Sequence, residues 1–203
     1  MSIERVWIES EYPLEGVLTY GSKDLGVIIC HPHPLYGGSM RNNVVFALER
    51  GFLELNFTTL KFNFRGVEKS GGSYDDGRGE EKDLFSAIEF LESKLNPSAK
   101  LVLAGYSFGA WICAKVSIQK DKVSDLLLVS YPFSVYEKEP VMRFKKRIYF
   151  LCGSMDEISP VSQNMEVYQS LPQPEKSITI LETDHFYIGM EREIVDFVKR
   201  AFA

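Results

Sequence analysis

The sequence has little that would indicate a secreted or membrane-spanning protein. It contains only three cysteines, an odd number, and each lies in an apolar segment, which is typical of free thiols buried in a protein of a reducing compartment. No apolar run approaches the roughly 20 residues that a membrane helix needs, and the N-terminus lacks the apolar core of a signal peptide. We therefore expect a cytoplasmic protein that does not associate with membranes.

The sequence also has no excess of positive charge. The formal net charge is −5, which disfavours a surface for duplex nucleic acid. The one basic cluster, residues 143–147, directly precedes an apolar stretch, and we interpret it as a solvated flank that discourages aggregation. A nucleic-acid patch there is the alternative, but we expect no nucleic-acid partner.

Repeats, low-complexity tracts and linkers are absent from the sequence. A chain of 203 residues with 45% hydrophobic residues is long enough to bury a proper core, so we expect one domain over residues 1–203. Apolar runs of strand length alternate with segments in which apolar residues recur at helical spacing. This alternation predicts an α/β fold, a mainly parallel, doubly wound sheet with helices on both faces and no lid domain.

The expected elements follow from these patterns. The first two strands read as an antiparallel pair, and the continuous apolar strands that follow are typical of strands buried on both faces. Ser159-Pro160 reads as a cap and a first-turn proline that open a helix. We expect strands in residues 6–9, 14–20, 25–30, 57–64, 101–104, 126–129, 148–152 and 178–181, and helices in residues 43–55, 84–95, 110–116, after 160 and in 194–202.

A serine stands at the apex of a predicted strand, turn and helix. Ser107 is the central residue of GYSFG, residues 105–109. Side chains two residues on either side of it would collide with the strand and the helix, and glycine avoids the collision because it has no Cβ. The context predicts a hydroxyl held at the carboxyl edge of the sheet with a helix N-terminus behind it. A Gly/Ser turn without chemistry is the alternative.

A serine hydroxyl needs a base, and the base needs an orienting carboxylate. Of the three histidines, His31, His33 and His185, only His185 follows the serine, and it lies directly after the last predicted strand. Because the acid and the histidine follow the serine in this topology, we predict His185 as the general base. The loop after the penultimate strand supplies Asp156 as the orienting acid, with Glu157 as its rival.

Acyl transfer also needs two N–H donors for the oxygen of its tetrahedral intermediate. We predict that Phe108, directly after the serine, gives one of them. The other is expected from HPHPLYGG, residues 31–38, whose prolines have no N–H, with His33 as the better candidate and Leu35 as the alternative. His31 and His33 have a spacing that suits zinc, but no third ligand with a matching signature follows, so we expect no metal and no cofactor.

These residues resemble the α/β-hydrolase superfamily, and more narrowly a short branch of predicted hydrolases near the dienelactone hydrolases and the prolyl and X-Pro peptidases. The shared motifs are HPHPxxGG in residues 31–38, FNFRG in 62–66, DDG in 75–77 and DHF in 184–186. The resemblance implies this fold, a triad of Ser107, Asp156 and His185, and ester-type hydrolysis. It supplies no substrate, and dienelactone hydrolases proper have a cysteine where this chain has Ser107.

Three further motif residues have no assignable chemical step. We interpret Arg65, Asp75 and Asp76 as a salt-bridged loop scaffold, with binding of a substrate carboxylate by Arg65 as the alternative.

Residues 130–147 are too few for a lid domain, so we expect an open, shallow site for a small-molecule acyl substrate, which the second subunit of a homodimer could cover. We predict a carboxylesterase or thioesterase. The alternatives are a prolyl-type peptidase, which should need an acidic pair for a free amine, and a non-catalytic binding protein on a hydrolase fold. Aromatic residues near the expected site are Tyr36, Tyr106, Tyr131, Phe133, Phe186 and Tyr187.

Overall fold

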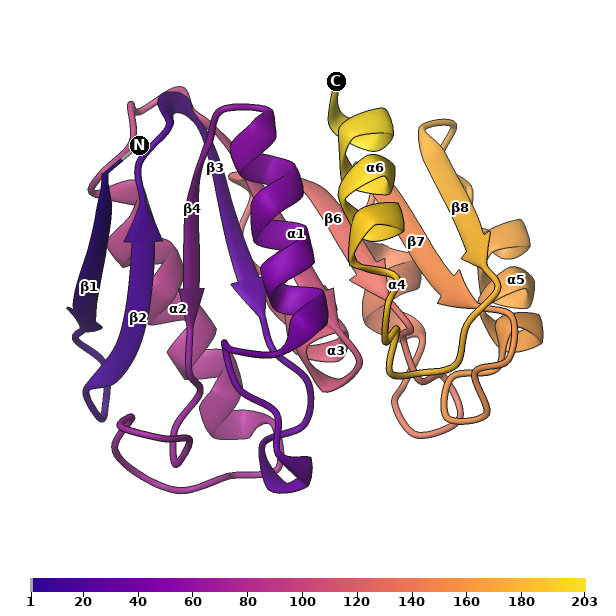
Figure 1. Cartoon of the computed structure of the whole chain (residues 1–203), viewed down its shortest axis with the longest axis horizontal. Helices are drawn as coiled ribbons and strands as arrows, with labels where there is room; N and C mark the ends of the chain where they lie inside the picture. The colour runs from indigo at the N-terminus through magenta and orange to yellow at the C-terminus, as the bar shows by residue number, and fades with distance from the viewer. Residues whose placement is uncertain (1) are drawn as a thin grey trace.

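A computed structural model describes residues 2–203 and shows a sheet of eight strands in the order β1-β2-β4-β3-β5-β6-β7-β8 (Figure 1). The first two strands form the expected antiparallel hairpin at one edge, and β2 is antiparallel to β4. All other neighbours pair in parallel, as a doubly wound sheet requires. The strands are β1 (Ile3–Ile8), β2 (Leu14–Thr19), β3 (Ser22–Cys30), β4 (Phe57–Phe62), β5 (Lys100–Tyr106), β6 (Val123–Val129), β7 (Arg147–Gly153) and β8 (Lys176–Leu181).

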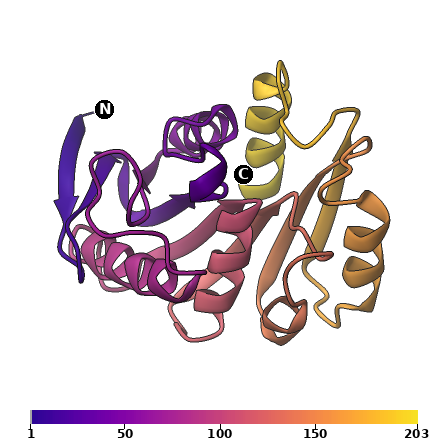
Figure 2. The same cartoon turned by 90° about the horizontal axis from the view of Figure 1, so that it is seen from below.

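Helices cover both faces of this sheet. Two of them, α1 and α6, pack together on one face, and α2, α3 and α5 lie on the other (Figure 2). No helix within residues 2–203 is long and apolar enough to cross a membrane. The helices are α1 (Asn43–Glu54), α2 (Arg78–Glu92), α3 (Phe108–Ser117), α4 (Glu139–Arg143), α5 (Val161–Ser170) and α6 (Glu191–Phe202), with a 3₁₀ turn, η1, at Pro34–Tyr36.

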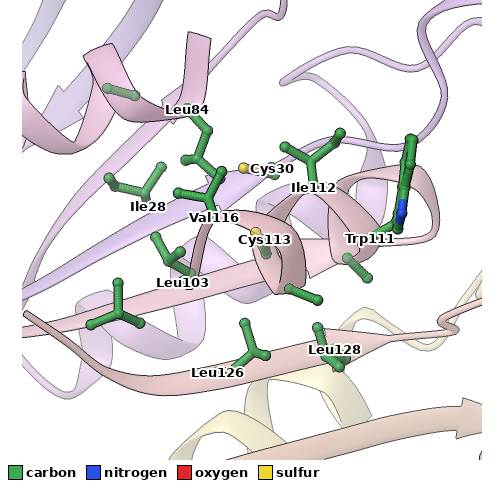
Figure 3. Close-up of a cluster of buried hydrophobic side chains, with 14 of the residues drawn as sticks. Ile28, Cys30, Leu84, Leu103, Trp111, Ile112, Cys113, Val116, Leu126 and Leu128 are labelled. Atoms are coloured by element: carbon green, nitrogen blue, oxygen red, sulfur yellow. The ribbon is translucent and has the colours of Figure 1, made fainter. Parts of the chain in front are cut away.

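The central strands are apolar throughout because they are buried on both faces. Along β3, Ile28 and Cys30 enter the core beneath α2 and α3, whereas Val27 and Ile29 enter the core beneath α1 and α6. Successive side chains of a strand point to opposite faces, so one uninterrupted run supplies both cores. Figure 3 shows the first of these cores, in which Leu103 lies among side chains of the two helices and of neighbouring strands. All three cysteines are buried and free.

The structure corrects two expected helices and adds two short elements. Helix α2 begins earlier than expected, at Arg78, and ends at Glu92, so Leu95 lies outside it. Helix α5 begins at Val161 with Pro160 as its N-cap, so Ser159 does not cap it. Instead the buried Ser159 hydroxyl donates to the Tyr131 carbonyl at 2.7 Å. The sequence analysis did not predict η1 or α4, which are only 3 and 5 residues long. Between β6 and β7 the chain holds only α4, so no lid domain is present there.

Candidate active site

Ser107 occupies the sharp turn between β5 and α3. Its backbone has φ 55° and ψ −118°, a conformation that non-glycine residues adopt rarely and only where the surrounding structure holds it. The two flanking glycines are required by space. A Cβ on Gly105 would meet the carbonyl oxygen of Gly109 at 2.3 Å, and a Cβ on Gly109 would meet that of Cys30 at 2.5 Å. The turn therefore presents the serine hydroxyl beyond the carboxyl end of β5.

The three residues predicted as a triad meet in one hydrogen-bonded chain. The Ser107 hydroxyl lies 3.1 Å from Nε2 of His185 and donates to it when the imidazole is neutral. On the other side of the ring, Nδ1–H of His185 donates to Oδ2 of Asp156 at 2.8 Å. All three side chains are buried, each belonging to a residue that is at most 8% exposed. Loops that follow β5, β7 and β8 supply them, so the sheet brings together residues that are 29 and 78 positions apart in sequence.

Asp156 is held as a carboxylate by donors on both oxygens. Its Oδ1 accepts from the N–H groups of Ile158 at 3.0 Å and Ser159 at 2.7 Å, and its Oδ2 accepts from the Ser130 hydroxyl at 2.7 Å. Burial alone would raise the pKa of the Asp156 carboxyl, but the hydrogen bonds from His185, Ser130 and Ser159 outweigh it and lower the pKa. The acid next to the imidazole therefore stays charged at neutral pH.

Two buried tyrosines hold the loop that carries His185. The Tyr106 hydroxyl donates to the His185 carbonyl at 2.5 Å. Tyr187 is fully buried at a positive φ of 55°, and its hydroxyl lies 2.7 Å from that of Ser130. The two nearby acids take no part in this chain, because Asp184 accepts from the Phe186 N–H in an exposed turn and Glu157 points into solvent.

The two backbone N–H groups predicted for the oxyanion hole have no protein acceptor within residues 2–203. Phe108 is the first residue of α3, where N–H groups have no acceptor within the helix. Within residues 2–203, the His33 N–H also donates to no protein acceptor. The alternative donor, the Leu35 N–H, is already used by Nδ1 of His33 at 3.2 Å. The His33 ring packs on that of Phe108 with centroids 5.0 Å apart, which brings the two loops together.

A cavity of about 570 Å³ opens over Ser107 and His185. Three of the predicted aromatic residues, Tyr36, Tyr106 and Phe186, line it. No aspartate, glutamate, lysine or arginine of the described chain does so. The remaining lining residues, several of which the sequence analysis missed, are Pro32, His33, Gly37, Gly38, Asn42, Pro132, Val135, Tyr136 and Ile158.

Two residues predicted for this pocket, Tyr131 and Phe133, lie elsewhere. The Tyr131 ring is fully buried and stacks on that of Phe133 with centroids 4.2 Å apart, and both pack against the core beneath α3. The Tyr131 hydroxyl donates to the Glu137 carbonyl at 2.7 Å, which satisfies it away from the cavity. Tyr187, also expected near the site, lies beneath it. An aromatic residue in a loop at the sheet edge can turn into the core as readily as into a site.

Both ring nitrogens of His31 make hydrogen bonds to backbone groups. Its Nδ1 lies 2.6 Å from the Pro32 carbonyl, and its Nε2 accepts from the Phe64 N–H at 3.1 Å. Burial lowers the pKa of this imidazole to about 4, so the ring is neutral at physiological pH. His31 thus ties the loop after β3 to the loop after β4, and neither ring nitrogen is free to bind a metal.

Arg65 is part of a buried ion pair rather than of the cavity. Its guanidinium pairs with Asp83 at 2.8 Å and with Glu11 at 3.2 Å. Neither Asp75 nor Asp76 contacts it by an ion pair, and Asp75 instead pairs with Arg78 at 3.1 Å. The expected salt-bridged scaffold is therefore present for Arg65, but with different carboxylates.

Comparison with known proteins supports the family that this geometry indicates. No family model matches the chain. It is 34% identical to an alpha-beta serine hydrolase homologue from Coxiella burnetii, covering 100% of this chain and 99% of that one with a TM-score of 0.92. It is 25% identical to XC6422 from Xanthomonas campestris, an a/b serine hydrolase without lid, covering 99% and 94% of the two chains with a TM-score of 0.88.

The chain thus belongs to the α/β serine hydrolases and lacks a lid domain. A curated relative, the uncharacterized protein RP471 of Rickettsia prowazekii (strain Madrid E), is 37% identical over 112 residues. That match covers 55% of this chain and 47% of the relative, so it spans about half the length of each.

Proposed function

We propose that this protein hydrolyses small, uncharged carboxylic esters or thioesters through an acyl-enzyme intermediate. The observation that carries the proposal is the hydrogen-bonded chain from Ser107 through His185 to Asp156, which opens into a cavity large enough for a small acyl group. Membership of the α/β serine hydrolases supports hydrolysis as the reaction class.

In the first half-reaction, the Ser107 oxygen attacks the substrate carbonyl carbon while Nε2 of His185 takes the hydroxyl proton. The carbonyl oxygen becomes an oxyanion, which the N–H groups of Phe108 and His33 stabilise. The imidazolium that forms is stabilised by the Asp156 carboxylate. When the tetrahedral intermediate collapses, the leaving alcohol or thiol takes the proton from Nε2 and an ester of Ser107 remains.

In the second half-reaction, water replaces the leaving group. His185 takes a proton from the water, whose oxygen attacks the acyl carbon, and the same two N–H groups hold the new oxyanion. Collapse returns the proton to the Ser107 oxygen and releases the carboxylic acid. The strongly hydrogen-bonded Asp156 keeps the imidazole in the tautomer that both steps use.

The lining of the cavity supports the choice of substrate class. Its side chains are apolar, aromatic or neutral, so a charged acyl or alcohol group would lose hydration without gaining an ionic partner. A peptidase that recognises a free amine needs a carboxylate near the nucleophile, and within the described chain no carboxylate lines the cavity. Esters of short acids with small alcohols fit this chemistry best.

Covalent labelling tests the proposal directly. A fluorophosphonate probe should label the wild-type protein and leave Ser107→Ala unlabelled, whereas Ser93→Ala, at an exposed serine far from the cavity in sequence and fold, should label like wild type. A folded wild-type protein without label would support the binding-protein alternative instead.

Turnover should then be measured on p-nitrophenyl esters of increasing chain length, on acyl-CoAs and on aminoacyl-anilides. We expect hydrolysis of the short esters, with a loss of roughly 10⁴-fold or more in kcat for Ser107→Ala and His185→Ala. Preference for aminoacyl-anilides would support the peptidase alternative.

A further inference from the structure

A second cavity lies at the β1 edge of the sheet, away from Ser107. This edge cavity has a volume of about 420 Å³ and is enclosed by β1, β2, β4, the start of α1 and the loops before α1 and after β4. In Figure 1, β1 and β2 lie to the left of α1, at the edge of the sheet, and no helix of residues 2–203 lies in front of them. The lining residues are Arg5, Val6, Trp7, Glu15, Gly16, Val17, Met40, Arg41, Phe46, Lys61 and Lys69.

The lining of the edge cavity combines exposed aromatic side chains with charged ones. Trp7 is 56% exposed and Phe46 is 47% exposed, unusual values for such large apolar side chains. Strand register places Arg5 opposite Val17 and Val17 opposite Lys61, so these three side chains form a row across one face of the sheet. A ligand here would meet two exposed aromatic side chains beside Arg5.

The charge in the edge cavity is positive after its ion pairs are counted. Lys61 is buried and pairs with Glu49 at 2.5 Å, and Arg41 pairs with Glu68 at 2.9 Å. No carboxylate of residues 2–203 pairs with Arg5 or with Lys69, which leaves two free cations. Glu15 is the only acidic lining residue, so the balance is one positive charge.

One carboxylate oxygen of Glu15 already accepts hydrogen bonds from the protein. Its Oε1 accepts from Asn63 Nδ2 at 2.9 Å and from the Lys69 N–H at 2.7 Å. Asn63 in turn accepts from the Met40 N–H at 2.7 Å. These bonds hold the cavity wall in place without a ligand, so an occupant would meet a preformed site. They also connect that wall to residues 37–42, several of which line the cavity over Ser107.

We propose that the edge cavity binds one small organic monocarboxylate, with its charged group beside Arg5 and Lys69 and its apolar body against Trp7 and Phe46. A single negative charge matches the charge balance, whereas a dianion would be repelled by Glu15. The exposed rings of Trp7 and Phe46 favour a ligand that carries an apolar body beside its charge. This site is independent of the proposed esterase activity.

The two tryptophans of the chain allow the site to be tested by fluorescence. Trp7 lines the edge cavity, whereas Trp111 is buried and stacks at 4.1 Å on Tyr136, which lines the cavity over Ser107. In Trp111→Phe the only tryptophan is Trp7, and in Trp7→Phe it is Trp111. Phenylalanine retains the ring at position 111, and the Trp111 indole N–H has no hydrogen-bond partner to lose within the described chain.

Hexanoate is the probe, and hexanamide and inorganic phosphate are its comparators. Titrating Trp111→Phe with hexanoate should change Trp7 emission saturably, with a Kd on the order of 1 mM. Hexanamide should bind at least about tenfold more weakly because it lacks the charge, and phosphate should cause no saturable change. Equal affinity for hexanoate and hexanamide, or no saturation below about 50 mM hexanoate, would overturn the proposal.

Charge reversal locates the binding. In the Trp111→Phe background, Arg5→Glu with Lys69→Glu should weaken hexanoate binding at least about tenfold. Lys23→Glu with Arg192→Glu changes the net charge equally at exposed positions outside the cavity and should leave the Kd unchanged. Thermal melts confirm that both double variants fold. Equal Kd values for the two variants would show that any binding is elsewhere.

Discussion

Ser130 donates a 2.7 Å hydrogen bond to the same oxygen of Asp156 that accepts from His185. The residue is fully buried at the end of β6, with a positive φ of 46° that serine adopts only under constraint. Because the Ser130 hydroxyl donates to a carboxylate, the Tyr187 hydroxyl 2.7 Å away must donate to Ser130. The proposed triad therefore continues through two more buried hydroxyls, which orient the acid.

Removing this support should weaken catalysis without removing the triad. Ser130→Ala takes one of the donors from Asp156, which raises the pKa of its carboxyl and loosens its orientation. We expect kcat/KM for a short ester to fall about tenfold, or about 1.4 kcal/mol, mainly through kcat.

Ser117→Ala is the matched control, because Ser117 is also buried but its hydroxyl donates to its own helix at Ala114. That variant should retain wild-type kcat and KM. Wild-type kcat/KM for Ser130→Ala would show that the carboxylate needs no donor from Ser130.

The triad could be predicted because topology restricts where its members stand in the chain. Ser107, Asp156 and His185 each follow a parallel strand, and parallel strands end at one edge of the sheet. Chain order therefore selected His185 as the base and the loop after β7 as the source of the acid, although it did not separate Asp156 from its rival Glu157. Gly105 and Gly109 added a local signal. A Cβ at either position would lie only 2.3 Å or 2.5 Å from a backbone carbonyl oxygen, so only glycine fits there.

The rest of the site carries no comparable signal. Ser130 is a single serine after an apolar strand, and its role depends on a contact across 26 residues that no local pattern indicates. Val135 and Tyr136 lie in an irregular segment, where only the folded path decides which side chains face the cavity. For the same reason the sequence analysis wrongly expected Tyr131 and Phe133 to line the cavity, whereas both pack against the core.

The structure predicts how His31 affects stability in acid. Burial lowers the pKa of His31 to about 4 in the folded protein, from 6.5 in an unfolded chain. The unfolded state therefore binds more protons between these values, so the free energy of unfolding should fall as the pH falls from 6.5 to 4, by as much as about 3 kcal/mol. Above pH 6.5 this contribution is constant.

Urea unfolding at several pH values checks this in wild type and in His31→Gln. The variant should be less stable at pH 7 because it loses the fitted imidazole, but its stability should depend less on pH between 6.5 and 4. His33→Gln is the comparison: burial also lowers the pKa of the partly exposed His33, but less than that of His31, so its slope should change less than that of His31→Gln. Parallel slopes for His31→Gln and wild type would contradict the buried neutral state.

Two glycines near the site, Gly109 in α3 and Gly189 in the loop before α6, should respond differently to alanine. At Gly109 a Cβ would lie 2.5 Å from the Cys30 carbonyl oxygen and 2.6 Å from that of His31, and backbone cannot move aside cheaply. At Gly189 the φ is 80° but no atom lies within 4 Å, so alanine meets only backbone strain. Strain of that kind costs about 1–2 kcal/mol.

Gly109→Ala should therefore destabilise the protein more than Gly189→Ala, by several kcal/mol against about 1–2 kcal/mol. It should also abolish fluorophosphonate labelling, because α3 would shift away from β3 and move Ser107. Thermal melts and labelling of both variants decide the point. Equal loss of stability would mean that the packing of α3 on β3 is looser than the distances imply.

Tyr136 should set the length of acyl chain that the cavity accepts. Its ring stacks on Trp111 with centroids 4.1 Å apart and an interplanar angle of 5°, so one face is fixed against the core while the residue lines the cavity. Tyr136→Ala removes this wall and enlarges the apolar space. We expect the ratio of kcat/KM for p-nitrophenyl octanoate to that for the butyrate to rise about tenfold, because about two methylene groups gain contact in the new space.

The expected change lies mainly in KM, since Tyr136 contacts none of Ser107, His185 and Asp156 by a hydrogen bond. Tyr168→Ala is the matched control: this tyrosine is on α5, packs against the same core and does not line the cavity. Its octanoate-to-butyrate ratio should equal that of wild type. A Tyr136→Ala ratio that stays at the wild-type value while both rates fall would assign Tyr136 to stability, and the acyl chain would then have to lie along other lining residues such as Phe186.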